Sequence, residues 1–121
     1  MIVKKILFVD DEADLLRVAS LRLRKTGYEV FEAIDGKAAL EQARAKMPDL
    51  IVLDVFLPDM QGDEVARILK ADAKTKHIPI ILISADSRSL EERARESGAE
   101  DFLPKVFDSG ALVSKIGKHL A

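Results

Sequence analysis

The sequence predicts an α/β fold in which helices cover both faces of a parallel five-stranded sheet. Apolar runs of strand length alternate along the chain with helix-length segments of mixed polarity, as repeated βαβ units require. The runs at 50–53 and 80–83 are entirely aliphatic, which is typical of central parallel strands buried on both faces. Right-handed crossovers between such strands place helices on both sides and give a doubly wound sheet.

The expected elements account for most of the 121 residues. Apolar runs predict strands near residues 4–9, 28–33, 50–54, 79–83 and 100–103. The intervening segments predict helices near residues 13–26, 37–47, 62–74, 87–97 and 108–120. The second strand alternates polar and apolar residues, so we place it at an edge of the sheet. Gly27 stands where a left-handed helix cap is expected, and Pro48 disfavours continuation of the second helix.

The last two helices differ in how firmly we expect them to be held. The fifth has an apolar stripe at helical spacing, made by Leu112, Val113, Ile116 and Leu120. The fourth consists mainly of charged side chains, so it buries little surface. We therefore expect the fourth helix to be among the least stable elements.

Composition narrows the class of function. The chain is 48% hydrophobic and 33% charged, with a net charge of −2, so no basic field favours nucleic acid or an anionic membrane. It has no cysteine, which excludes disulfides, thiolate metal sites and a cysteine nucleophile. No stretch resembles a signal peptide or a membrane span. We expect a single domain, residues 1–121, in the cytoplasm and without an output domain.

Polar side chains follow the expected strands at the points where the strands end. Asp10 and Asp11 follow the first strand, Asp54 ends the third, Ser84 follows the fourth and Lys105 follows the fifth. Ligands of doubly wound sheets bind in the crevice outside the carboxyl ends of the strands. Three acids, a hydroxyl and an amine are therefore predicted to meet there, and this set suits a metal ion and a phosphoryl group.

Each residue taken alone also has a simpler interpretation. Acids after a strand can cap the next helix, Asp54 and Ser84 can stabilise turns, and a lysine is usually a solvated surface charge. Their order along successive strand ends favours a site. Mg²⁺ prefers oxygen ligands such as adjacent carboxylates, and a carboxylate such as Asp54 can be phosphorylated as a nucleophile. The backbone carbonyl of Phe56 is placed to supply a further oxygen ligand.

Four motifs give the chain a specific family resemblance. They are LFVDDE at 7–12, LDVFLPDMQG at 53–62, ISA at 83–85 and GAEDFLPK at 98–105. On these motifs the chain resembles, over essentially its whole length, the receiver domain of two-component response regulators, in particular the stand-alone chemotaxis type. The resemblance implies a flavodoxin-like sheet in the order 2-1-3-4-5 with five helices.

The resemblance also implies a role for each site residue. Asp54 would be the phosphoacceptor, and Mg²⁺ would be held by Asp10, Asp11, Asp54 and the carbonyl of Phe56. Ser84 and Lys105 would contact phosphoryl oxygens. The aromatic switch position matches Phe102, which would turn inward when the Ser84 hydroxyl moves toward the phosphoryl group.

The implied function is regulatory. A sensor histidine kinase, a phosphotransferase or a small phosphodonor would supply the phosphoryl group, and catalysis would be limited to self-phosphorylation and slow autodephosphorylation. A downstream protein would read the face formed by the fourth helix, fifth strand and fifth helix. Neither nucleic acid nor a membrane is expected as a direct partner.

Two features depart from the family pattern. Val106 replaces the proline that usually follows the lysine through a cis peptide; a cis bond before a non-proline residue costs roughly 3–4 kcal/mol, which favours a trans bond and a shifted loop. Phe56 and Asp86 occupy the positions that tune dephosphorylation in this family. Phe56 could shield the acyl phosphate, whereas Asp86 could orient water or repel an anionic donor.

Three other functions remain open. A phosphate-independent binding module would keep the fold, and the missing proline favours it slightly. A phosphatase with an Asp54 nucleophile would need a second acid two residues later, where Phe56 stands. A flavin or dinucleotide module would need a glycine-rich loop after the first strand, where the acids stand.

Overall fold

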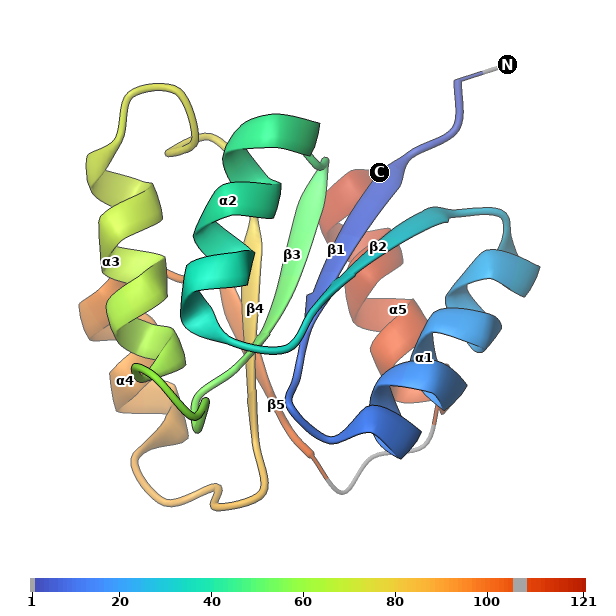
Figure 1. Ribbon diagram of the computed structural model, residues 1–121. Helices are drawn as coiled ribbons and strands as arrows, with labels where there is room; N and C mark the ends of the chain where they lie inside the picture. The colour runs from blue at the N-terminus through green and yellow to red at the C-terminus, as the bar shows by residue number, and fades with distance from the viewer. Residues whose placement is uncertain (1, 106–108) are drawn as a thin grey trace.

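The structure is a computed structural model that describes residues 2–105 and 109–121 (Figure 1). Five parallel strands form one sheet in the order β2-β1-β3-β4-β5, which confirms the expected topology. The strands are β1 (Lys5–Val9), β2 (Glu29–Ala33), β3 (Leu50–Asp54), β4 (Ile80–Ser84) and β5 (Asp101–Pro104). The helices are α1 (Ala13–Thr26), α2 (Gly36–Lys46), α3 (Gly62–Ala71), α4 (Leu90–Ser97) and α5 (Ser109–Leu120).

The helices form a layer on each side of the sheet, with α2, α3 and α4 on one side and α1 and α5 on the other (Figure 1). Side chains alternate across the central strands. In β3, Ile51 and Leu53 join the core beneath α2, α3 and α4, and Leu50 and Val52 join the core beneath α1 and α5. All four are fully buried, as the continuous aliphatic run predicts.

Two helix boundaries differ from the expectation because side chains form local turns. The third helix ends at Ala71 rather than near residue 74, since Asp72 is extended and its carboxylate accepts from the amide of Lys74 at 2.9 Å. The fourth begins at Leu90 rather than near residue 87. The amide of Arg88 donates to Asp86 at 3.0 Å, which holds the preceding segment in a turn.

Of the smaller expectations, two are confirmed and two concern residues that the structure does not describe. Gly27 has φ of +110° and caps α1 as predicted, and β2 is at an edge of the sheet. The start of the fifth helix at Asp108 and the peptide bond between Lys105 and Val106 lie outside the described residues. Within the part of the chain that is described, no helix is long and apolar enough to cross a membrane.

Candidate functional site

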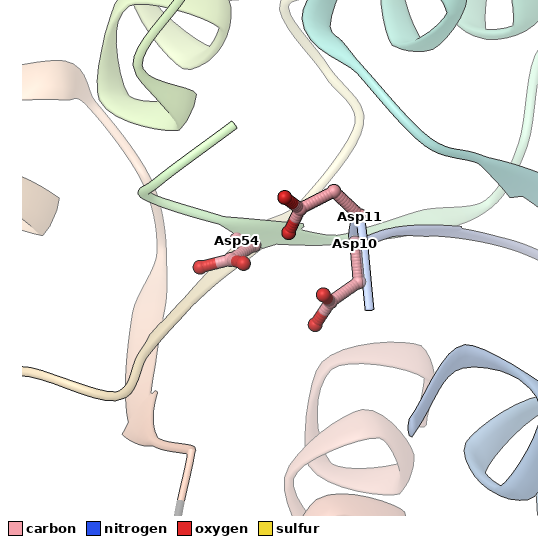
Figure 2. Close-up of side chains that lie close together, drawn as sticks. All are labelled: Asp10, Asp11 and Asp54. Atoms are coloured by element: carbon pink, nitrogen blue, oxygen red, sulfur yellow. The ribbon is translucent and has the colours of Figure 1, made fainter. Parts of the chain in front are cut away.

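The register of the sheet brings the polar strand ends together. Val9 pairs with Leu53 across β1 and β3, and Ser84 pairs with Pro104 across β4 and β5. Asp54 pairs with Ile83, directly before Ser84. The predicted site residues therefore lie at the carboxyl edge of four adjacent strands, where the three aspartates meet (Figure 2).

The acids form a compact cluster. Asp10, Asp11 and Asp54 each offer an oxygen atom that lies within 4.8 Å of the others. Asp10 is fully buried and Asp54 is 2% exposed, whereas Asp11 is exposed. Backbone amides orient the buried pair: Glu12 donates to Asp10 Oδ1 at 2.9 Å, and Phe56 donates to Asp54 Oδ1 at 3.2 Å.

Lys105 supplies positive charge to this cluster. Its Nζ donates to Asp54 Oδ2 at 3.0 Å, to Asp10 Oδ1 at 3.2 Å and to the carboxylate of Glu12. Burial raises the pKa of Asp10 and of Asp54, and the ammonium opposes that rise. Burial of Lys105 itself favours its neutral form, but its hydrogen bonds to Glu12, Asp54 and Asp10 outweigh burial and raise its pKa.

The contact between Glu12 and Lys105 was not identified from the sequence. Glu12 is the third acid of a consecutive acidic run, and its side chain is 61% exposed. The run is a sequence signal for this contact, but helix-start acids are common enough to make it weak. Because the ammonium is shared among three carboxylates, its position depends on all of them.

The residues of the cluster fit a hard cation. Asp10 Oδ2 is buried, and none of the described residues donates a hydrogen bond to it, although Lys105 Nζ lies 3.1 Å away. Buried carboxylate oxygens normally have a partner. An oxygen without a donor, among acids that outnumber the neighbouring cation, is the kind of ligand that Mg²⁺ takes in proteins.

Ser84 lies beside Lys105 at the ends of β4 and β5. Ser84 is 1% exposed, its Oγ accepts from the amide of Asp86 at 3.1 Å, and its carbonyl accepts from the amide of Lys105 at 2.7 Å. Phe102 is partly buried against the core beneath α4, and Lys115 Nζ lies 6.0 Å from its ring centroid. The structure thus brings Ser84 to the site, while Phe102 lies on β5 between α4 and α5.

A tight loop follows the central aspartate. The amide of Gly62 donates to the carbonyl of Val55 at 2.6 Å, and a Cβ at Gly62 would lie 1.9 Å from the carbonyl oxygen of Asp54. Glycine is therefore required where the loop returns to α3. Phe56 pairs with Gln61 across the loop and is 45% exposed.

The chain is similar in sequence to known proteins. The family profile of the response regulator receiver domain matches residues 6–117. The chain is 43% identical over 113 residues to the response regulator PleD of Caulobacter vibrioides, covering 93% of this chain and 25% of PleD. The chain spans between a quarter and about half of the length of the curated relatives that it matches.

Solved structures show the same fold. The chemotaxis response regulator CheY4 of Vibrio cholerae has a TM-score of 0.91 at 28% identity, with 98% of this chain and 99% of that chain covered. The receiver domain of the sensor histidine kinase PA1611 of Pseudomonas aeruginosa PAO1, described with a magnesium ion coordinated in its active-site cleft, has a TM-score of 0.90 at 28% identity and 98% coverage of both chains. Sequence profile, relatives and fold agree, and the chain belongs to the family of response regulator receiver domains.

Proposed function

We propose that residues 1–121 act as a single receiver domain in which Asp54 is the phosphoacceptor. Phosphorylation-activated switching is the general function of this family. The observation that carries the assignment is the environment of Asp54, a nearly buried carboxylate at the end of a central strand, 3.0 Å from the ammonium of Lys105. The positive charge of Lys105 lies where it can offset the negative charge of an incoming phosphoryl group.

Asp10, Asp11, Asp54 and the carbonyl of Phe56 would hold Mg²⁺ in this proposal. The buried Asp10 oxygen that lacks a hydrogen-bond donor from any described residue supports it, as does the clustering of the three carboxylates. When bound, Mg²⁺ offsets the negative charge of the carboxylates and of the phosphoryl oxygens.

The transfer requires little from the protein beyond position and charge. An oxygen of Asp54 forms the new bond to phosphorus, and the bond from phosphorus to the donor nitrogen or oxygen breaks, its electron pair leaving with the donor. Lys105 and the hydroxyl of Ser84 contact the phosphoryl oxygens. The donor is a histidine kinase, a phosphotransferase or a small phosphodonor, and slow hydrolysis returns the carboxylate.

The output of the proposed switch is the face formed by α4, β5 and α5. Ser84 and Lys105 lie at the ends of β4 and β5, next to this face, and Phe102 lies within it. Movement of Ser84 toward a phosphoryl group would make room for the Phe102 ring, whose present position is only partly buried. A downstream protein would distinguish the two states of the face.

The assignment is tested by intact mass after incubation with acetyl phosphate, with and without Mg²⁺. We expect a single phosphoryl adduct that requires Mg²⁺ and is absent in Asp54→Asn. Glu41→Gln, which removes an exposed acid from α2, is the matched control and should still be modified.

An adduct that persists in folded Asp54→Asn at the same rate would refute the acceptor assignment. If the wild-type chain forms no adduct, binding of beryllofluoride separates rapid hydrolysis from an inactive site. Failure of both would favour a phosphate-independent binding module.

A further inference from the structure

Arg93 joins α4 to the loop that follows the proposed phosphoacceptor. Its Nη1 donates to Gln61 Oε1 at 2.8 Å and to Asp63 Oδ2 at 3.0 Å. Its guanidinium carbon lies 5.6 Å from the centroid of the Phe56 ring, within the range of a cation–π contact. A side chain of α4 therefore contacts both ends of the β3–α3 loop.

The position of the Arg93 guanidinium is fixed by a buried carboxylate. The side chain of Asp63 is 7% exposed and that of Arg93 is 30% exposed, so this ion pair is poorly screened by water. Arg67 is also near Asp63, at 3.6 Å. A buried carboxylate holds its cation more firmly than an exposed one, because separation would leave the charge desolvated.

The same loop is held on its other side by Asp59. The carboxylate of Asp59 accepts from the amides of Gly36 and Lys37, at 2.7 and 2.9 Å, at the start of α2. Phe56 in turn donates its amide to Asp54 Oδ1. An unbroken series of contacts thus runs from Arg93 through Phe56 to the acceptor carboxylate.

We propose that Arg93 is a positioning residue that holds Phe56 beside the acceptor and thereby links the lifetime of the aspartyl phosphate to the position of α4. This inference rests on the proposed function of Asp54. The ring of Phe56 is half exposed, and the Arg93 guanidinium lies over it. With Arg93 in place, the ring limits the approach of water to the phosphorylated carboxylate.

The step that Arg93 influences is hydrolysis. A water oxygen forms a bond to phosphorus, the bond between phosphorus and the Asp54 oxygen breaks, and its electron pair returns to the carboxylate. The water protons pass to solvent and to inorganic phosphate. Withdrawal of Arg93 releases the ring and opens this approach, so a partner that displaces α4 shortens the phosphorylated state.

The test is the rate of phosphate release from protein phosphorylated with acetyl phosphate and then freed of donor. We expect Arg93→Ala to accelerate release roughly two- to fivefold, the effect of a cation–π contact at a partly exposed site. Arg95→Ala removes the same charge from an exposed position of α4 and should leave the rate unchanged. In a Phe56→Ala background, Arg93→Ala should add nothing further.

Equal rates in wild type and Arg93→Ala, or the same acceleration with and without the Phe56 ring, would overturn the inference. Because Arg93→Ala leaves Asp63 with Arg67 alone, the series is repeated with Asp63→Asn to remove the buried charge. Because Asp63 anchors the guanidinium, Asp63→Asn alone should accelerate release, and Arg93→Ala should add less in that background than in the wild type.

Hydrogen exchange of the Phe56 amide, in unphosphorylated protein without metal, provides a second readout. Arg93→Ala should accelerate this exchange, and Arg95→Ala should not; unchanged exchange would show that Arg93 does not position the loop. Failure of the wild-type chain to form an adduct would count against the acceptor assignment, whereas an adduct with an unaltered lifetime would count against Arg93 alone.

Discussion

The ammonium of Lys105 is shared among more carboxylates than it can neutralise. It contacts Asp10, Glu12 and Asp54, and Asp11 lies in the same cluster. Burial of like charges is unfavourable unless a cation compensates them. Repulsion among these carboxylates therefore destabilises the folded protein, and a bound cation would relieve that repulsion.

Lys105→Met should expose this repulsion. Breaking a buried ion pair is expected to lower the free energy of unfolding without metal by about 3 kcal/mol. Millimolar Mg²⁺ should raise the melting temperature of wild type, because it binds the folded form. The rise should be larger in Lys105→Met, where no ammonium has to be displaced from Asp10 and Asp54.

Melting curves with and without Mg²⁺ check this prediction, with Lys118→Met as the control because Lys118 is exposed on α5. Equal Mg²⁺ shifts in wild type and Lys105→Met would contradict competition between the ammonium and the metal. Absence of any shift in wild type would contradict the metal site itself.

Some contacts of the site could be predicted from the sequence, and others could not. The neighbourhood of Asp10, Asp54, Ser84 and Lys105 could be predicted, because each residue ends a strand of a parallel sheet or directly follows one, and the order of the strands then places them side by side. The contacts of Arg93 could not be predicted in this way. They depend on the distance between α4 and the β3–α3 loop, which no spacing within either segment encodes.

At the scale of elements, α4 is held unequally at its two ends. Ser89 enters the helix with φ of +61°, a left-handed conformation that costs a non-glycine residue about 1–2 kcal/mol. Beyond the other end, Lys70 Nζ donates to Glu100 Oε2 and to the carbonyl of Ile78, both at 2.7 Å. The start of α4 also carries the buried Leu90 and the ion pair of Arg93 with Asp63, so movement of this end must break that ion pair.

Helix α5 is attached to β5 by a partly buried acid. Lys115 Nζ and His119 Nε2 lie 3.0 and 2.9 Å from the carboxylate of Asp101. Burial alone would raise the pKa of Asp101, but these hydrogen bonds and the amide of Phe102 lower it from 3.8 to about 2. The apolar stripe predicted α5, whereas this polar attachment depends on residues of two elements and was not predicted.

Asp101→Asn should therefore lower stability in a pH-dependent way. Since the folded-state pKa is depressed, the carboxylate contributes stability above pH 4, and that contribution is lost as pH falls toward 2. A depression of this size corresponds to about 2 kcal/mol at neutral pH.

Urea unfolding of wild type and Asp101→Asn between pH 7 and pH 3 measures the difference, which should shrink below pH 4. Asp14→Asn removes an exposed acid of α1 and should show a small difference throughout. A loss in Asp101→Asn that stays constant across this range would indicate a packing effect instead of the charge of the carboxylate.

At the scale of the whole molecule, the proposed switch should affect one region and spare another. We expect beryllofluoride to change the hydrogen exchange of amides in α4 by roughly tenfold, an ordinary coupling free energy, with smaller changes in β5 and α5. The fully buried strand β3 and helix α2 should change little. The reason is that α4 follows the strand that ends at Ser84 and contacts the β3–α3 loop through Arg93.

Hydrogen exchange followed by peptide mass spectrometry checks the pattern, and Asp54→Asn treated with beryllofluoride is the control. A uniform change over all five helices would indicate general stabilisation by the ligand. Protection confined to the β3–α3 loop would place the response at the site without a switch.

The fold as a whole was predictable because several independent features of the sequence indicate the same architecture. Aliphatic runs identify the central strands, helix-length segments separate them, and parallel pairing follows from the alternation. The end of α3 and the start of α4 lie at turns whose geometry depends on individual side chains, so these boundaries were less predictable than the order of the elements. The polar and apolar pattern of the sequence predicts the topology, whereas the helix boundaries depend on contacts of individual side chains.

The sheet also partitions the molecule. Its described buried side chains form one cluster under α2, α3 and α4 and another under α1 and α5, and both reach the edge where the aspartates lie. The hydrogen-bonded backbone of the sheet separates the two clusters, so a substitution in one cluster has little direct effect on the packing of the other. The outer surface of α1, which is not part of the proposed output face, can therefore be changed while α4, β5 and α5 keep their places, so that the scaffold can acquire a new contact surface without altering its switch.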